Sequence, residues 1–156
     1  MLKKYWIIIA VTAAIVITAF LISMFCFQLM LVHGDSMSPA LKNMHLALID
    51  KRSENYRAGD IIVFRCDGLK SMLVKRVAGC PGDSVRIQDG KLYVNGSESP
   101  LYKNAVIEYP GLLASETVLG DDEFAVLGDN LAESRDSRDE EVGIIHRQDI
   151  TGKVIM

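Results

Sequence analysis

Residues 72–78 read Met72-Leu73-Val74-Lys75-Arg76-Val77-Ala78, and this stretch decides the fold class. A short apolar run rich in valine is typical of a β-strand, in which successive side chains point to opposite faces. Lys75 is therefore expected to share a face with Leu73 and Val77. A lysine among apolar neighbours either extends its ammonium group to solvent or is buried with a lowered pKa. In the second case it can act as a base near neutral pH.

Similar apolar runs, separated by turns, lie on both sides of this stretch. They are predicted to be strands and occupy residues 46–49, 61–65, 85–88, 91–94, 124–127 and 150–155. Asp89-Gly90 predicts a two-residue hairpin of type I′. Residues 96–120 are irregular and contain Pro100 and Pro110, so a loop or a small appended lobe is expected there. The sequence thus predicts a mostly β, antiparallel domain with such a lobe.

An uncharged apolar run from Tyr5 to Val32 precedes the β region. About 20 apolar residues cross a membrane as a helix, whereas the apolar part of a cleavable signal peptide has about 7–15. We therefore expect residues 5–32 to be a retained transmembrane anchor in contact with membrane lipid. Two lysines precede the run and an aspartate follows it. The positive-inside rule then places residues 1–4 in the cytoplasm and residues 33–156 outside it, in a single-pass protein of the cell membrane.

Composition excludes several classes of function. The chain has 17 Lys and Arg against 20 Asp and Glu, and a net charge of −3, which argues against nucleic acid as a partner. The cysteines are Cys26, Cys66 and Cys80, with no Cys-x-x-Cys pair, so no zinc site is expected. Either a Cys66–Cys80 disulfide or two free thiols are compatible with the sequence.

Two polar segments could supply catalytic groups. The first, Gly34-Asp35-Ser36-Met37-Ser38-Pro39, lies directly after the apolar run, and the second, residues 128–138, follows the strand at 124–127. A serine hydroxyl needs a base to become a nucleophile. Each segment alone is also typical of a solvated turn. The combination of Ser36 beside a membrane with Lys75 in an apolar strand indicates a membrane-anchored serine protease.

Four segments behind the anchor resemble the bacterial type I signal peptidases in their order and spacing: residues 36–39, 59–64, 74–83 and 128–138. The short distance between the third and fourth segments resembles the compact, single-anchor members typical of Gram-positive bacteria. The resemblance implies a mostly β catalytic fold that removes signal peptides from secretory preproteins at the outer membrane surface. It implies no metal and no organic cofactor.

The resemblance also implies roles for single residues. Ser36 corresponds to the nucleophile, Lys75 to the general base, and Ser134 to the hydroxyl that orients the lysine. Met37 matches the residue after the nucleophile, and the charged residues that hold the site together correspond to Arg76, Asp129, Asp136 and Arg138. The Ser36 N–H is expected to form part of the oxyanion hole. Some relatives have a serine where this chain has Gly34, so the second donor would be another backbone N–H.

Three alternatives remain at this point. A Ser-His-Asp triad could use His33, His45 or His146. A self-cleaving Ser-Lys repressor would share the chemistry, but the anchor and the lack of a DNA-binding segment argue against it. A membrane-tethered binding module could keep the fold without activity, but every side chain expected for catalysis is present.

Overall fold

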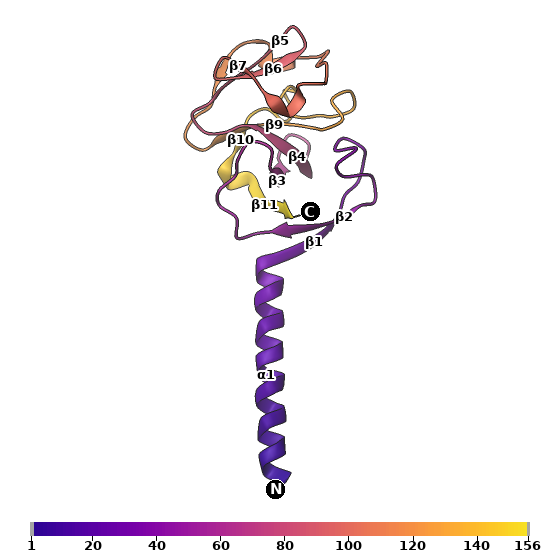
Figure 1. Cartoon of the computed structure of the whole chain (residues 1–156), viewed down its shortest axis with the longest axis vertical. Coiled ribbons are helices and arrows are strands. Elements are labelled where there is room, and N and C mark those ends of the chain that lie inside the picture. Colours follow the sequence, from indigo (N-terminus) through magenta and orange to yellow (C-terminus); the bar gives the residue numbers. More distant parts are fainter. Residues whose placement is uncertain (1, 156) are drawn as a thin grey trace.

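The structure is a computed structural model that describes residues 2–155, and it begins with one long helix. α1 (Leu2–Cys26) contains a 22-residue span, Tyr5–Cys26, that is long and apolar enough to cross a membrane. None of this span is buried against the rest of the chain, and the helix extends away from the β-strands (Figure 1).

The helix ends before the expected boundary of the anchor. Residues up to Val32 were expected in the anchor, but Phe27–Leu31 form strand β1, which pairs with β2 (Leu46–Asp50). The Lys51 N–H donates to the Cys26 carbonyl oxygen at 2.9 Å, where the helix ends. Apolarity did not reveal this boundary because β1 is an apolar strand at the sheet edge, which continues the apolar run of the helix.

A seven-stranded antiparallel sheet forms the body of the β domain. Its strand order is β1-β2-β11-β3-β4-β9-β10. The remaining members are β3 (Ile61–Cys66), β4 (Ser71–Gly79), β9 (Glu123–Leu127), β10 (Ile145–His146) and β11 (Ile150–Ile155). Within it, β4 lies between β3 and β9, which places Lys75 opposite Ile62 in a central strand.

A second, four-stranded sheet forms the appended lobe, at the end of the molecule away from α1 (Figure 1). Its order is β7-β6-β5-β8, with bounds Ser97–Glu98, Lys91–Val94, Ser84–Gln88 and Thr117–Val118. Asp89 and Gly90 have φ angles of 51° and 74°, which confirms the type I′ hairpin between β5 and β6. Within residues 2–155 there are also three short 3-10 helices: η1 (Pro100–Tyr102), η2 (Gly111–Ala114) and η3 (Arg147–Asp149).

The core has three apolar clusters, and the two-residue period of the strands distributes side chains among them. In β3, Ile61 and Val63 join the cluster that includes Met37, whereas Ile62 and Phe64 join the cluster on the opposite face. The third cluster joins the end of the large sheet to the small one. The predicted strands all formed. β1, β7, β8 and β10 were not predicted.

Candidate active site

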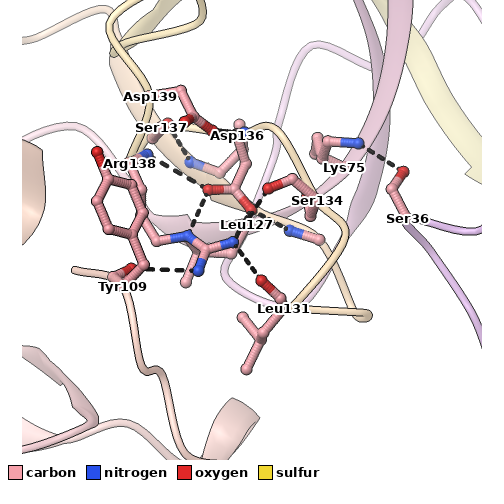
Figure 2. A network of polar contacts seen from close by, with 12 residues as sticks. Ser36, Lys75, Tyr109, Leu127, Leu131, Ser134, Asp136, Ser137, Arg138 and Asp139 are labelled. Atoms are coloured by element: carbon pink, nitrogen blue, oxygen red, sulfur yellow. Dashed lines mark hydrogen bonds and ion pairs between the residues drawn. The ribbon is translucent and has the colours of Figure 1, made fainter. Parts of the chain in front are cut away.

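Ser36 and Lys75 lie side by side, although 39 positions separate them in the sequence. Ser36 is in the turn after β1, and Lys75 is in the middle of β4. Lys75 Nζ donates a hydrogen bond of 2.7 Å to Ser36 Oγ (Figure 2). The two side chains that the sequence singled out therefore meet at hydrogen-bonding distance.

The turn that carries Ser36 is fixed by buried apolar residues and by the loop after β9. Met37 and Leu41 are buried, and the Leu41 N–H donates to the Met37 carbonyl oxygen at 2.8 Å. The Asn130 N–H donates to the Ser36 carbonyl oxygen at 3.0 Å. Within residues 2–155 the Ser36 N–H donates no hydrogen bond. The serine is thus held from both sides while its own N–H stays available.

Lys75 is buried, with 3% of its surface exposed. Burial lowers its pKa to about 8, because the charged ammonium loses solvation; the nearby Asp136 carboxylate acts in the opposite direction. Leu73 and Val77 pack in one apolar cluster and Val74 in another, as the strand alternation predicts. The lysine is therefore in the environment that a neutral amine requires.

The four predicted charged residues form two ion pairs beside the Ser36–Lys75 pair. Arg76 donates two hydrogen bonds to the Asp129 carboxylate, at 2.7 and 2.6 Å, and a third to the Gly59 carbonyl oxygen at 2.6 Å. Arg138 and Asp136 form a second two-bond pair, at 2.8 and 2.9 Å, with both side chains buried.

The Asp136–Arg138 pair holds the loop after β9 together by hydrogen bonds to backbone groups of the same loop. The Asp136 carboxylate accepts from the Gly128 N–H at 3.0 Å, and Arg138 donates to the carbonyl oxygens of Leu131 and Ser134 at 2.9 and 3.2 Å (Figure 2). The loop is therefore built around a buried ion pair, whereas the sequence alone also allowed a solvated turn.

Ser134 is in place but does not make the expected hydrogen bond. Its side chain is buried, and its Oγ has no hydrogen-bond partner within the described residues. In Figure 2 it lies between Lys75 and the network around Arg138. The resemblance implied a bond to Lys75, but Lys75 Nζ donates to Ser36 Oγ instead. A buried hydroxyl without a partner is rare and invites a functional explanation.

Ser36 lines one cavity, and a second cavity is lined by Pro39 and Ala40 of the same turn. The smaller, about 100 Å³, is lined mainly by apolar residues at 30–33 and 72–75 and by Met37, Ser36 itself forming part of the wall. The larger is an open groove of about 960 Å³ between Pro39 and Ala40 on one side and residues 100–105 on the other, with Arg76 and Asp129 also in its wall. An extended polypeptide passing Ser36 could enter both.

Comparison with known proteins assigns the family. The chain matches the family described as "Signal peptidase, peptidase S26" over residues 3–156. It belongs to this family. Signal peptidase I P of Bacillus subtilis subsp. natto is 32% identical over 147 residues, which cover 87% of this chain and 79% of that relative. Signal peptidase I U of Bacillus subtilis strain 168 is 34% identical over 156 residues, covering 92% and 83%.

A solved structure supports the same assignment. The crystal structure of a signal peptidase I from Enterococcus faecalis V583 matches with a TM-score of 0.53 and 25% identity, covering 65% of this chain and 97% of that one. The predicted mostly β fold and the predicted family are thus confirmed. As a member of the signal peptidase family, the chain is a hydrolase of the serine peptidase type.

No histidine of this signal peptidase forms a triad with Ser36 within residues 2–155. His33, His45 and His146 are exposed, and none is hydrogen bonded to the serine. His146 lies 3.3 Å from the Asp122 carboxylate. His33 lines the small cavity but makes no bond to Ser36 Oγ. The geometry therefore favours lysine over histidine as the base.

The cysteines are free thiols. Cys66 Sγ donates to the Glu141 carbonyl oxygen and Cys80 Sγ to the Tyr56 carbonyl oxygen, so the two side chains have separate partners. The disulfide that the sequence left open is not formed. Among the residues described, no cluster of three or more potential metal ligands is found.

Sequence reasoning missed the role of Gly128. A Cβ atom there would collide with the Ser134 side chain and approach the Ser36 carbonyl oxygen to 2.6 Å. The glycine therefore allows the strand end, Ser134 and the Ser36 turn to pack together. A glycine directly after an apolar strand was the available signal, but it is equally typical of an ordinary turn.

Proposed function

We propose that this chain is a membrane-anchored signal peptidase I that uses Ser36 as nucleophile and Lys75 as general base. The observation that carries the proposal is the 2.7 Å contact between Lys75 Nζ and Ser36 Oγ, made by a lysine with 3% of its surface exposed. A buried amine in contact with a serine hydroxyl is the arrangement that activates the hydroxyl without histidine.

The lowered pKa supports the role of Lys75 as base. With a pKa of about 8, about one lysine in ten is neutral at pH 7, against about one in three thousand for an ordinary lysine. In the neutral form the hydrogen bond reverses, and the Ser36 hydroxyl donates to the amine. Ser36 Oγ attacks the scissile carbonyl carbon as Lys75 Nζ takes its proton, and the lysine then protonates the leaving amine.

Hydrolysis of the ester completes the cycle. The neutral Lys75 takes a proton from a water molecule, which attacks the acyl carbon, and Ser36 leaves with that proton. The free Ser36 N–H would stabilise the oxyanion of both tetrahedral intermediates. The Ser134 hydroxyl lacks a hydrogen-bond partner. It would accept a hydrogen bond from the Lys75 ammonium group, and so orient the lysine, when Lys75 is no longer bonded to Ser36. The buried side chain of Met37 would hold the adjacent nucleophile in place by packing in the apolar core.

The small cavity supports signal peptides as substrates. Its volume of about 100 Å³ and its apolar lining suit a short side chain such as alanine in the residues before the cut. The cavity is formed in part by residues 30–33, which are the end of β1 and the two residues after it, and β1 directly follows α1. A signal peptide that is itself embedded in the membrane would approach from this side.

We place α1 across the cell membrane, with residues 1–4 in the cytoplasm and the β domain, which begins with β1 at Phe27, outside. The apolar span Tyr5–Cys26 and the flanking charges support this topology. A protease added to intact cells should digest the β domain and leave the anchor. Digestion only in inverted vesicles would reverse the orientation.

The experiment that tests the proposal is cleavage of a secretory preprotein by the purified full chain in detergent micelles. Ser36→Ala and Lys75→Ala should each abolish cleavage while the fold persists, because nucleophile and base act as a unit. Wild-type kcat/KM should rise with pH, with a midpoint near pH 8, as Lys75 loses its proton. An acid limb that moves when a histidine is replaced, or retained activity in Lys75→Ala, would refute the lysine mechanism.

A further inference from the structure

The open groove extends from the turn that carries Ser36 to the segment that follows the strands of the appended lobe. One of its walls, residues 100–105, follows directly on the strands of the appended lobe. The lobe is at the end of the molecule opposite α1, whereas β1, which contributes to the small cavity, adjoins the helix (Figure 1). A chain with its signal peptide in the membrane would therefore leave Ser36 toward this groove after the cut site.

The groove is connected to the candidate active site by two of its walls. Pro39 and Ala40 belong to the turn of Ser36. Asp129 precedes Asn130, whose N–H binds the Ser36 carbonyl oxygen. A polypeptide segment in the groove would thus be continuous with a scissile bond at Ser36. The volume of about 960 Å³ is at the upper end of the range for ligand sites and is large enough for several residues.

The charge of the groove comes from Lys103. The Arg76 guanidinium and the Asp129 carboxylate neutralise each other through two short hydrogen bonds. Lys103 is exposed at the groove wall, and no carboxylate within the described residues pairs with it. Its neighbour Tyr102 is buried, with its hydroxyl 3.5 Å from the Leu127 carbonyl oxygen, which anchors this wall to the large sheet. The groove therefore presents one uncompensated positive charge on a fixed wall.

We propose that this groove binds the first residues of the mature polypeptide, after the cut, and that Lys103 makes it favour an acidic side chain there. The inference rests on the proposed peptidase activity and adds a preference on the mature side of the cut. Lys103 does not contact the Ser36–Lys75 pair and would act on binding and positioning of the substrate. A basic side chain at the same position would be disfavoured by repulsion.

The test uses the full chain in detergent micelles and preprotein peptides with one signal sequence. The peptides carry Asp, Asn or Lys at each of the second to fifth positions after the cut, and kcat/KM is measured by competition. Wild type should cleave the Asp peptide about two- to fivefold faster than the Asn peptide at one or two adjacent positions, the size of an exposed ion pair. The preference should shrink at high salt, because exposed charges are screened.

Charge reversal separates this inference from general effects of net charge. Lys103→Glu should invert the order, so that the Lys peptide becomes the better substrate, and Lys103→Gln should abolish the preference. Lys70→Glu is the matched control, because Lys70 is exposed in the β3–β4 turn and does not line the groove. It should keep the wild-type order.

The outcomes distinguish the two proposals. Cleavage without any charge preference, or a preference unchanged in Lys103→Glu, overturns the groove inference and leaves the peptidase proposal intact. The same inversion in Lys70→Glu also overturns it, because the effect would then follow net charge. Absence of cleavage for every peptide, or cleavage that persists in Ser36→Ala, overturns the peptidase proposal and with it the role of the groove.

Discussion

Replacing Lys75 with methionine should make the folded protein more stable near neutral pH while abolishing its activity. Methionine keeps an unbranched side chain but removes the charge, and Lys75 is buried among apolar neighbours. Burial of the ammonium is what lowers the lysine pKa from 10.5 to about 8. At pH 7 the folded protein must carry that charge in the core, whereas the unfolded chain carries it in water.

The size of the gain follows from the pKa values. The difference between 10.5 and about 8 corresponds to about 3 kcal/mol of destabilisation by the charged lysine at pH 7. The variant also loses the hydrogen bond to Ser36, which contributes about 1 kcal/mol. A net gain of about 2 kcal/mol remains, and for a domain of this size it should raise the melting temperature by about 6–10 °C.

The pH dependence gives the prediction its sign. The destabilisation of the folded state by the charged Lys75 is fully present below the pKa of about 8 that Lys75 has in the folded protein. It disappears as pH rises toward 10.5, because the lysine of the unfolded chain then loses its proton as well. The assay is thermal unfolding of the full chain in micelles from pH 6 to 10. Ser36→Ala, which keeps the lysine, is the control and should follow the wild-type pH dependence. A stability difference between Lys75→Met and wild type that is constant over this range, or a less stable Lys75→Met at pH 7, would refute the reasoning.

Three further substitutions probe the loop after β9. Asp136→Asn should lower the free energy of unfolding by about 3–5 kcal/mol, seen in thermal melts, because its buried guanidinium partner loses its counter-charge; an unchanged melt would mean that the pair is not buried. Ser134→Ala should leave the melting temperature unchanged, because the Ser134 hydroxyl has no hydrogen-bond partner. If this hydroxyl orients Lys75 in the reaction, kcat should fall about ten- to a hundredfold. A variant with wild-type kcat would exclude that role. Gly128→Ala should reduce both cleavage and stability, because the added methyl group collides with Ser134; full activity would show that the strand end can shift at little cost.

The central strands were predictable because their local signals agree with their tertiary environment. Residues 61–66 and 71–79 are apolar, β-branched runs bounded by turns, and they form the central pair β3 and β4. Asp89-Gly90 allows little except a type I′ turn, since both residues must take positive φ. A few adjacent residues specify such elements, so they can be predicted from the sequence alone.

The missed elements depend on contacts with distant residues. β7 and β8 have two residues each and become strands only by pairing with β6 and β5. β1 has an apolar sequence that fits a membrane helix equally well, and its pairing with β2 decides the outcome. For the site, the sequence and the family resemblance named Ser36, Lys75 and the charged residues. They could not give the orientation of the Ser134 hydroxyl, which depends on how the whole loop packs.

The Lys75 pKa is lowered although two carboxylates lie near the lysine. Asp136 and Asp129 both raise the Lys75 pKa, and either carboxylate alone would stabilise the ammonium form. Arg138 lowers the Lys75 pKa, and it is the hydrogen-bonded partner of Asp136. Arg76 is likewise the hydrogen-bonded partner of the Asp129 carboxylate. Burial is the largest cause of the lowered Lys75 pKa, and Arg138 opposes the effect of its partner Asp136 on that pKa. The Asp136–Arg138 pair therefore holds the shape of the loop while its two charges act on Lys75 in opposite directions.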